Sequence, residues 1–260
     1  MSMTIIQAIK NYNKRLVSVY RKEALKIFFD DIFLVSYPKS GNTWVRFLLA
    51  NLLKEGDELI DFKSAIKYVP EIGIHNDELV NLKRPRIIKS HELYNAKYPK
   101  VVYIVRDPRD VYVSYFHYLK KKLPIGLTFS AFLRKKDLYP SRWHEHVNSW
   151  IDKPNLLLVR YEDLLVDTFG EFSKILSFMG RNEFNERQIK SSIRASTFQK
   201  MKKIENEKGR PFKTKEEALK ATHFMRKGER GDWVHYFQEE DLRFIKTEAQ
   251  DLMVRLDYCI

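Results

Sequence analysis

One turn between two apolar segments constrains this sequence more than any other feature. Residues 34–49 read LVSYPKSGNTWVRFLL, which predicts a buried strand, a tight turn that carries Lys39, and a helix. The free N–H groups and the positive dipole end of a helix N-terminus attract anions, so the turn predicts a phosphate-like ligand. The usual nucleotide-triphosphate loop, G-x-x-x-x-G-K-[ST], is absent because the lone Gly41 follows Lys39. The turn by itself leaves the identity of the anion open.

Short apolar runs alternate with helical patterns along the chain. The runs of strand length lie at 32–36, 86–90, 101–105 and 156–160. Buried strands separated by helices predict an α/β fold with a central parallel β-sheet and helices on both faces. At 260 residues, the chain is expected to form a single domain over 1–260.

The helical patterns are spread over the whole chain. They lie at 42–54, 109–122, 128–136, 141–151, 162–179, 184–194 and 239–255. Residues 5–29 also have helical periodicity, which predicts a helix packed on the domain edge, with a membrane-surface helix as the alternative. The charged stretch 203–221 contains a Gly-Arg-Pro break and predicts a mobile loop or lid near 203–222.

The charge balance limits the partners that fit this chain. The net charge of +13 favours an anionic ligand, nucleic acid or an acidic surface. The single Cys259 excludes an internal disulfide and favours a reducing compartment, and we expect a cytoplasmic location. No apolar run reaches the roughly 18 residues of a membrane span, and the basic N-terminus does not resemble a signal peptide.

Four polar or aromatic side chains follow the predicted strands directly. They are Lys39, His91, Arg106 and Tyr161. Ligands of open parallel sheets bind beyond the carboxyl ends of the strands. We therefore expect these residues to converge on one crevice although they lie far apart in the sequence.

Five segments together resemble the sulfotransferases that use 3′-phosphoadenosine 5′-phosphosulfate (PAPS). They are YPKSGNTW (37–44), IIKSHE (87–92), VVYIVRDPRDVYVSYFHY (101–118), VRYEDL (159–164) and FMRKGERGDW (224–233), in the family's order. The resemblance implies a P-loop-like fold and transfer of a sulfuryl group to a hydroxyl, with an amine as the alternative acceptor. PAPS would be the donor and adenosine 3′,5′-bisphosphate (PAP) the product. The wording SYPKSGNTWVR looks closer to bacterial members than to animal cytosolic ones.

The resemblance also implies which residues bind the donor. The loop that would hold the 5′-phosphosulfate consists of Lys39, Ser40, Gly41, Asn42 and Thr43. The residues implied for the 3′-phosphate are Arg106, Ser114, Arg226, Lys227 and Gly228. Those implied for the adenine are Trp44, Tyr161, Thr197 and Phe198.

Several of these residues also have a purely structural interpretation. Trp44 and Tyr161 could also be core residues, and Arg106 could simply pair with Asp110.

The chemistry of sulfuryl transfer gives Lys39 a second role. In a loose transition state the transferred group approaches neutral SO₃, and charge gathers on the bridging oxygen of the departing phosphate. A cation at that oxygen accelerates the reaction because it binds charge that exists only in the transition state. We find no acidic cluster beside the loop, so no metal ion is expected.

A histidine is the expected general base. An acceptor hydroxyl must lose its proton as it attacks, and an imidazole can take it near neutral pH. His91 follows a predicted strand and shares a strand face with Lys89, and the catalytic His of the similar family falls at this position. We expect His91, Lys89 and Lys39 to be catalytic, with Glu92 as a reserve base. The rival pair His144 and His146 is expected to be at the surface or in the acceptor region.

Two alternative functions fit part of the sequence. One is a P-loop-type nucleotide kinase, which the missing second Gly and missing metal carboxylates disfavour. The other is a basic protein that binds nucleic acid or a membrane surface, although the motifs indicate no nucleic-acid partner. The acceptor is expected to be a small molecule, a glycan or a lipid headgroup. Neither its identity nor the oligomeric state follows from the sequence.

Overall fold

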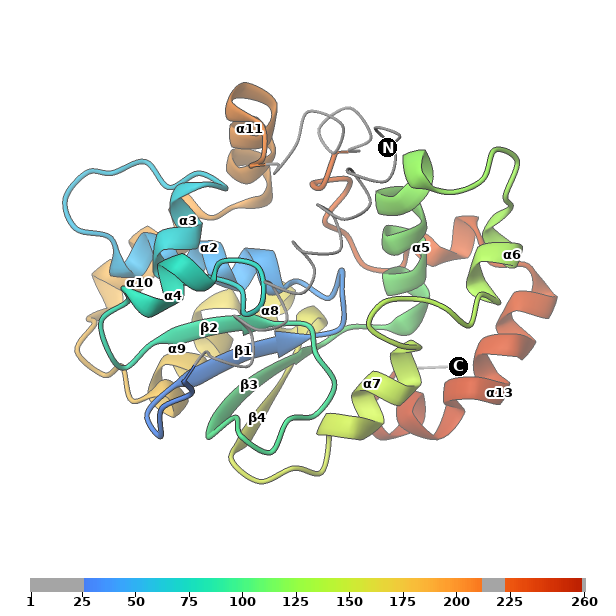
Figure 1. The fold of residues 1–260 in the computed structure, drawn as a ribbon. Helices are drawn as coiled ribbons and strands as arrows, with labels where there is room; N and C mark the ends of the chain where they lie inside the picture. The colour runs from blue at the N-terminus through green and yellow to red at the C-terminus, as the bar shows by residue number, and fades with distance from the viewer. Residues whose placement is uncertain (1–25, 212–222, 259–260) are drawn as a thin grey trace, which may run out of the picture.

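A single parallel sheet forms the centre of the protein (Figure 1). The structure, a computed structural model, describes residues 26–211 and 223–258. The strand order is β2-β1-β3-β4. The strands are β1 (Ile32–Ser36), β2 (Ile87–Ser90), β3 (Lys100–Val105) and β4 (Leu156–Arg160). Each lies within one residue of its predicted bounds, and the predicted α/β fold with a central parallel sheet is confirmed.

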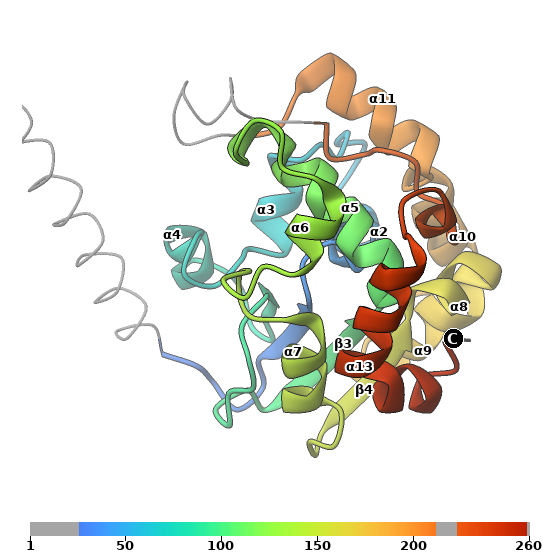
Figure 2. The same ribbon diagram turned by 90° about the vertical axis from the view of Figure 1, so that its right-hand side faces the viewer.

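Helices cover both faces of the sheet (Figure 2). The helices that pack on one face are α2 (Asn42–Leu53), α8 (Tyr161–Val166), α9 (Thr168–Met179) and α10 (Glu186–Ala195). Those on the other face are α5 (Pro108–Leu119), α6 (Phe129–Leu133), α7 (Trp143–Trp150) and α13 (Glu239–Arg255). The shorter or more peripheral elements are α3 (Ser64–Tyr68), α4 (Asn76–Val80), η1 (Lys120–Lys122), α11 (Phe198–Lys208) and η2 (Asp232–His235).

Strand β1 shows why both faces are apolar. Successive side chains of a strand point to opposite faces of a sheet. Phe33 and Val35 enter the hydrophobic cluster that includes α7 and α13, whereas Ile32 and Leu34 enter the cluster formed with α2, α9 and α10. Since β1 lies between β2 and β3, a continuous apolar run is what this position requires.

The predicted helix at 162–179 is wrong in one respect, because the structure divides it into α8 and α9. Asp167 separates them, with φ −132° and ψ 77°. Its side chain accepts a hydrogen bond from the backbone N–H of Gly170 over 2.8 Å and thereby caps α9. The capping carboxylate competes with helix continuation at this point.

The predicted loop near 203–222 begins later than expected. Residues 203–208 form the last part of α11, which the sequence did not indicate as a helix. The hydroxyl of Thr197 caps this helix, and Met201 and Ile204 bury one side of it. Residues 212–222 lie outside the described part of the chain, as do residues 5–25 of the predicted N-terminal helix.

Within residues 26–211 and 223–258, no helix is long and apolar enough to cross a membrane.

Candidate active site

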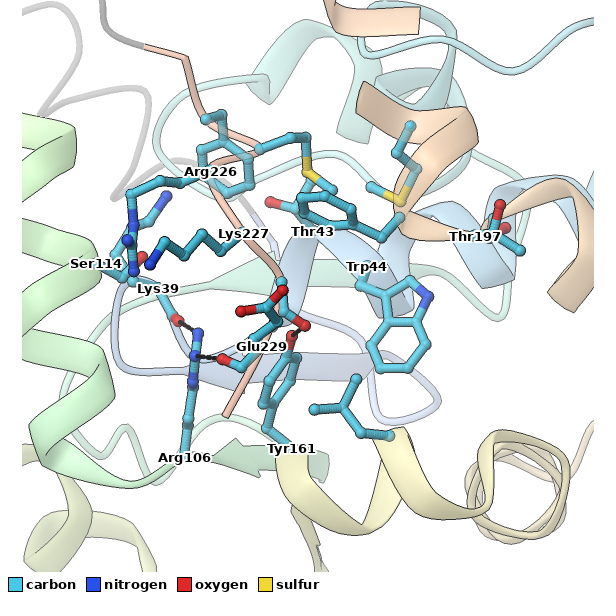
Figure 3. A pocket seen from close by; sticks show the side chains of 18 of the residues that line it. Lys39, Thr43, Trp44, Arg106, Ser114, Tyr161, Thr197, Arg226, Lys227 and Glu229 are labelled. Atoms are coloured by element: carbon cyan, nitrogen blue, oxygen red, sulfur yellow. Dashed lines mark hydrogen bonds between the residues drawn. The ribbon is translucent and has the colours of Figure 1, made fainter. Parts of the chain in front are cut away.

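A cavity of about 280 Å³ opens beyond the carboxyl ends of β1, β3 and β4 (Figure 3). Most of the residues predicted to bind the donor line it. They are Lys39, Gly41, Thr43, Trp44, Arg106, Ser114, Tyr161, Thr197, Phe198, Arg226, Lys227 and Gly228. The predicted residues that do not line it are Ser40, Asn42, Lys89 and His91. β1 and β3 are neighbours in the sheet, and β4 lies next to β3. The segments that follow these strands therefore meet at one edge of the sheet, although they are distant in the sequence.

The loop between β1 and α2 has an unusual backbone at two positions. Lys39 has a φ of 70°, and Gly41, which precedes α2, has a φ of 101°. A Cβ atom on Gly41 would lie 2.5 Å from Cδ2 of Tyr161. Glycine therefore satisfies both the left-handed backbone and the close approach of the tyrosine ring. The hydroxyl of Ser40 is buried and has no hydrogen-bond partner among the described residues.

The side chain of Asn42 is turned into the sheet. Its amide donates to the carbonyl oxygen of Leu34 over 3.1 Å and to the hydroxyl of Ser36 over 3.2 Å. These bonds fix the first residue of α2 against β1. The part that Asn42 can offer to a ligand is therefore its backbone N–H.

The ammonium group of Lys39 lies among aromatic rings. Its Nζ is 3.3 Å from the ring centroid of Phe224 and 4.6 Å from that of Tyr118. Burial lowers the pKa of Lys39 well below its usual value, and the positive charges of Arg210 and Arg106 lower it further. A bound anion would offset these effects and favour the protonated form.

Arg106 links three segments of the cavity. Its guanidinium donates to the carbonyl oxygen of Lys39 over 3.3 Å and to that of Glu229 over 2.8 Å (Figure 3). It also lies 4.4 Å from the ring centroid of Tyr161. The ion pair with Asp110, at 3.7 Å, is its longest polar contact. Pairing with Asp110, the structural role that the sequence suggested for Arg106, is therefore only one of its contacts.

Asp110 instead holds the C-terminal motif. Its carboxylate accepts hydrogen bonds from the backbone N–H groups of Gly231, over 2.7 Å, and Trp233, over 3.1 Å. Asp232, between them, pairs with Arg226 at 2.6 Å and with Lys227 at 2.5 Å. The G-D-W motif thus orients two cations at the cavity.

The two ends of the cavity differ in chemistry. Lys39, Ser114 and Arg226 gather at one end, and Trp44 and Thr197 lie at the other (Figure 3). The first end suits phosphate oxygens, because guanidinium, ammonium and hydroxyl groups are all donors. The second offers the indole ring as a surface for a flat apolar group.

Tyr161 has both a structural contact and a place in the cavity, the two interpretations that the sequence left open. Its ring packs edge-on against Trp44, with centroids 5.9 Å apart, and lines the cavity. Its hydroxyl donates to the carbonyl oxygen of Gly228 over 3.3 Å. Gly228 also lies against Phe198, since a Cβ atom there would be 2.3 Å from Cδ2 of that ring.

His91 lies at the end of β2, next to β1. Its Nδ1 is 2.7 Å from the carbonyl oxygen of Ser36, and because a carbonyl only accepts, Nδ1 carries the proton. Nε2 is then left with its lone pair. Burial lowers the pKa of His91 to about 3, and the charge of Lys89 contributes. The imidazole is therefore neutral at neutral pH and able to accept a proton at Nε2.

Lys89 has a carboxylate partner, and Glu92 has a hydroxyl partner. The Nζ of Lys89 lies 2.6 Å from Oε2 of Glu71. Oε2 of Glu92 accepts a hydrogen bond from the hydroxyl of Tyr98 over 3.0 Å.

Comparison with known proteins assigns this fold and site to a family. The sequence model of the sulfotransferase domain matches residues 29–257. The chain belongs to the sulfotransferase domain family. Sulfotransferase 1E1 of Rattus norvegicus is 33% identical over 236 residues, which cover 81% of this chain and 79% of the relative. The amine sulfotransferase of Oryctolagus cuniculus is 29% identical over 268 residues, which cover 93% and 88%.

A solved structure supports the same assignment. The mouse sulfotransferase SULT7A1, complexed with PAP, has a TM-score of 0.71 and 27% identity, and the match covers 91% of this chain and 88% of that one. The family decides for sulfuryl transfer over the kinase and the basic binder. The relatives named here are mammalian, so the likeness to bacterial sulfotransferases stays a prediction.

His146 was expected at the surface or in the acceptor region, and the surface position is wrong. In this sulfotransferase its side chain is fully buried. Its Nδ1 accepts from the hydroxyl of Tyr103 over 2.8 Å, and its Nε2–H donates to the carbonyl oxygen of His91 over 3.2 Å. His144 is half-buried, with Nδ1 3.9 Å from Glu248. The two histidines of the helix point apart, as their spacing indicated.

Sequence reasoning missed a buried carboxylate that bonds to the backbone of two cavity-lining residues. Glu205, on α11, accepts hydrogen bonds from the backbone N–H groups of Phe224, over 2.6 Å, and Met225, over 2.8 Å. It thereby fixes the backbone that places the Phe224 ring over Lys39. The one available signal was its position next to Ile204, on the apolar side of α11.

No group of three or more His, Cys, Asp or Glu side chains within the described residues could hold a metal ion.

Proposed function

We propose that this protein transfers a sulfuryl group from PAPS to a small-molecule acceptor and releases PAP. The observation that carries the proposal is the cavity itself, where cations and a hydroxyl gather at one end and an indole ring lies at the other. PAPS has the same division, with phosphates and sulfate on a flat adenosine. The mouse relative SULT7A1 complexed with PAP supports the same ligand.

The polar atoms of the cavity fit a ligand with two phosphates. Two residues that line the cavity have a buried donor with no hydrogen-bond partner among the described residues, at Nε of Arg106 and Nε of Arg226, and the loop beside the cavity adds a third at Oγ of Ser40. Buried donors without partners are costly, and phosphate oxygens would satisfy them. We assign Ser40 and the N-terminus of α2 to the 5′-phosphosulfate. Arg106, Ser114 and Arg226 are assigned to the 3′-phosphate, together with Lys227.

Lys39 is the residue that would stabilise the leaving group. As the acceptor attacks the sulfur, the bond from sulfur to the bridging oxygen of the 5′-phosphate breaks, and that oxygen gains negative charge. An ammonium fixed at the loop stabilises this charge without reorganisation. The aromatic contacts of Lys39 keep its ammonium partly desolvated, which strengthens the interaction.

His91 is the residue that would remove the acceptor's proton. The carbonyl oxygen of Ser36 holds the proton on Nδ1, so Nε2 is free to take another. The proton of an attacking hydroxyl would move to Nε2 as the new bond to sulfur forms. We place Lys89, which lies on β2 two residues before His91, beside the sulfuryl oxygens.

A hydroxyl is the preferred acceptor in this proposal, with an amine second. A neutral imidazole suits either, and the relatives include an amine sulfotransferase. Glycan and lipid-headgroup acceptors, membrane contact, a cytoplasmic location and a single domain over the whole chain stay predictions.

Transfer from labelled PAPS to a panel of phenols, steroids, alcohols and amines tests the proposal. The assay is run with EDTA, and a reaction without protein serves as the blank. Thermal unfolding with PAP and with Mg-ATP is measured in parallel. We expect label in at least one acceptor and stabilisation by PAP without metal. Stabilisation by Mg-ATP alone would support the kinase, and no response to either would contradict a nucleotide site.

A further inference from the structure

A short segment before α4 extends the edge of the sheet at Lys89. The backbone N–H of Lys89 donates to the carbonyl oxygen of Pro70 over 2.8 Å, and that of Ile72 donates to the carbonyl oxygen of Lys89 over 3.0 Å. Glu71 and Lys89 form a parallel β-bridge. Residues paired in this way project to the same side of a sheet. The backbone N–H of Glu71 also donates to Nδ1 of His75 over 3.1 Å, which fixes the turn that follows.

The side chains of Glu71 and Lys89 form an ion pair at this bridge. Oε2 of Glu71 lies 2.6 Å from Nζ of Lys89, and the two side chains are 13% and 10% exposed. A pair this close and this buried is screened little by salt. The ladder bonds of both backbones hold the partners in register, so the geometry does not depend on flexible side chains alone.

The charges that face Lys89 are mostly positive. Arg46 comes from α2 and Arg210 follows α11, and both disfavour the ammonium form, as burial does to a greater extent. Lys39, on the loop after β1, is also close enough to interact. Glu71 is the carboxylate that opposes them. Burial alone would raise the pKa of Glu71, but Lys89 and His91 outweigh it and lower that pKa to about 2.

We propose that Glu71 is a positioning residue that holds Lys89 as a fixed cation beside His91, on the acceptor side of the site. This inference rests on the proposed function. Without the carboxylate, Lys89 would sit among like charges with no ionic partner on its own strand edge. Its side chain would then lack the ion pair that fixes its position during sulfuryl transfer, and burial and the neighbouring cations would favour its neutral form.

Glu71 also bears on the base. The groups whose charges act on His91 are Lys89, on the preceding strand β2, Glu71, on the added segment, and His146, on α7. When His91 takes the acceptor's proton it becomes an imidazolium. The carboxylate of Glu71 stabilises that cation, whereas Lys89 destabilises it. Glu71 therefore offsets the repulsion between the cationic Lys89 and the imidazolium that His91 becomes.

The variant Glu71→Gln tests this by keeping the shape and removing the charge. At saturating PAPS, kcat is expected to fall about ten- to a hundredfold, as for loss of one charge-assisted hydrogen bond, while the dissociation constant of PAP stays unchanged. The alkaline limb of the kcat profile should move to lower pH by about one unit or more, because Lys89 loses the charge that keeps it protonated. A residue with a merely structural role would not move that limb.

Three further variants complete the experiment. Glu71→Asp keeps the charge and should leave the limb in place with partial kcat. Lys89→Arg stays protonated at all accessible pH values, so a limb due to Lys89 should disappear. Glu78→Gln is the matched control, since Glu78 is an exposed carboxylate of α4 that acts on Arg46 and His75 but is not among the main charges acting on Lys89 or His91.

The outcomes separate this inference from the function on which it rests. If the unmodified protein transfers no sulfuryl group to any acceptor, the proposed function fails first. If it does, and Glu71→Gln keeps both the kcat and the alkaline limb of the unmodified protein, the inference is overturned. If Glu71→Gln does not fold, Glu71→Asp decides the question. A shift of its alkaline limb by about one pH unit would then overturn the inference.

Discussion

The guanidinium of Arg106 donates a hydrogen bond to the carbonyl oxygen of Lys39 over 3.3 Å, which joins the end of β3 to the loop after β1. Lys39 has a φ of 70°, and this conformation belongs to the turn that leads into α2. Because Arg106 also bonds to the carbonyl oxygen of Glu229, it ties the loop to the C-terminal motif. The three regions of the donor cavity thus share one side chain.

Binding of PAP is expected to take up protons. Burial lowers the pKa of Lys39 in the free protein, and phosphate charge would raise it again. Between the two pKa values the free lysine is neutral and the bound one is charged, so affinity falls as pH rises through this window. Calorimetry in two buffers of different ionisation enthalpy measures the uptake. Lys39→Met, of similar length, should abolish it and lower kcat by about 10²–10³-fold. Equal uptake by this variant would assign the proton to another group.

Removal of the proposed base should separate turnover from binding. His91→Ala is expected to reduce kcat by about 10²–10⁴-fold, the range for a positioned general base, with PAP affinity nearly unchanged. His144→Ala is the matched control, because that half-buried imidazole lies against Glu248. Near-normal turnover in the His91 variant would move the role to Glu92.

The pH profile gives an independent test of His91. A base acts when unprotonated, so activity is retained above its pKa and lost below it. Burial lowers the pKa of His91 to about 3, whereas an ordinary histidine titrates near 6.5. With a neutral hydroxyl acceptor, kcat/KM should stay level from pH 8 down to about pH 5. A decline centred near pH 6.5 would show that His91 is an ordinary, solvated imidazole.

Glycine at position 41 is expected to matter for more than backbone freedom. Gly41→Ala adds a methyl group 2.5 Å from the ring of Tyr161, at a φ of 101°. We expect a loss of about 1–3 kcal/mol in unfolding free energy and weaker PAP binding. The matched control is Gly126→Ala, where φ is 81° and nothing lies within 4 Å. It should show the backbone strain alone, of about 1 kcal/mol, and unchanged PAP binding. Urea unfolding and calorimetry distinguish the two, and equal effects in both would contradict the role given to the ring contact.

The sheet and the donor loop could be predicted because their signals are local. A strand buried on both faces needs a continuous apolar run, as at 32–36, and the turn at Lys39 carries its glycine within the same short segment. The break at Asp167 was missed because a capping carboxylate looks like an ordinary polar position within a helical pattern. His146 was misplaced because its partners, Tyr103 and the His91 carbonyl, come from other elements.

The ion pair of Glu71 with Lys89 could not be predicted at all. It depends on a segment without strand-like sequence that adds itself to the edge of β2, a pairing that the fold determines and the local sequence does not. The same holds for Glu205, whose partners Phe224 and Met225 lie across residues 212–222 in the sequence.

The preference for a 3′-phosphate tests the central claim most directly. The competitive binding of PAP and of adenosine 5′-phosphate is measured in EDTA at fixed ionic strength. We expect PAP to bind at least about 10²-fold more tightly, since several charge-assisted bonds are lost with the 3′-phosphate. The double change Arg226→Ala with Lys227→Ala should remove most of that preference. Lys202→Ala with Lys203→Ala, an equal charge change on exposed residues of α11, should preserve it. Equal affinity of the unmodified protein for both nucleotides would contradict the site and the PAPS donor.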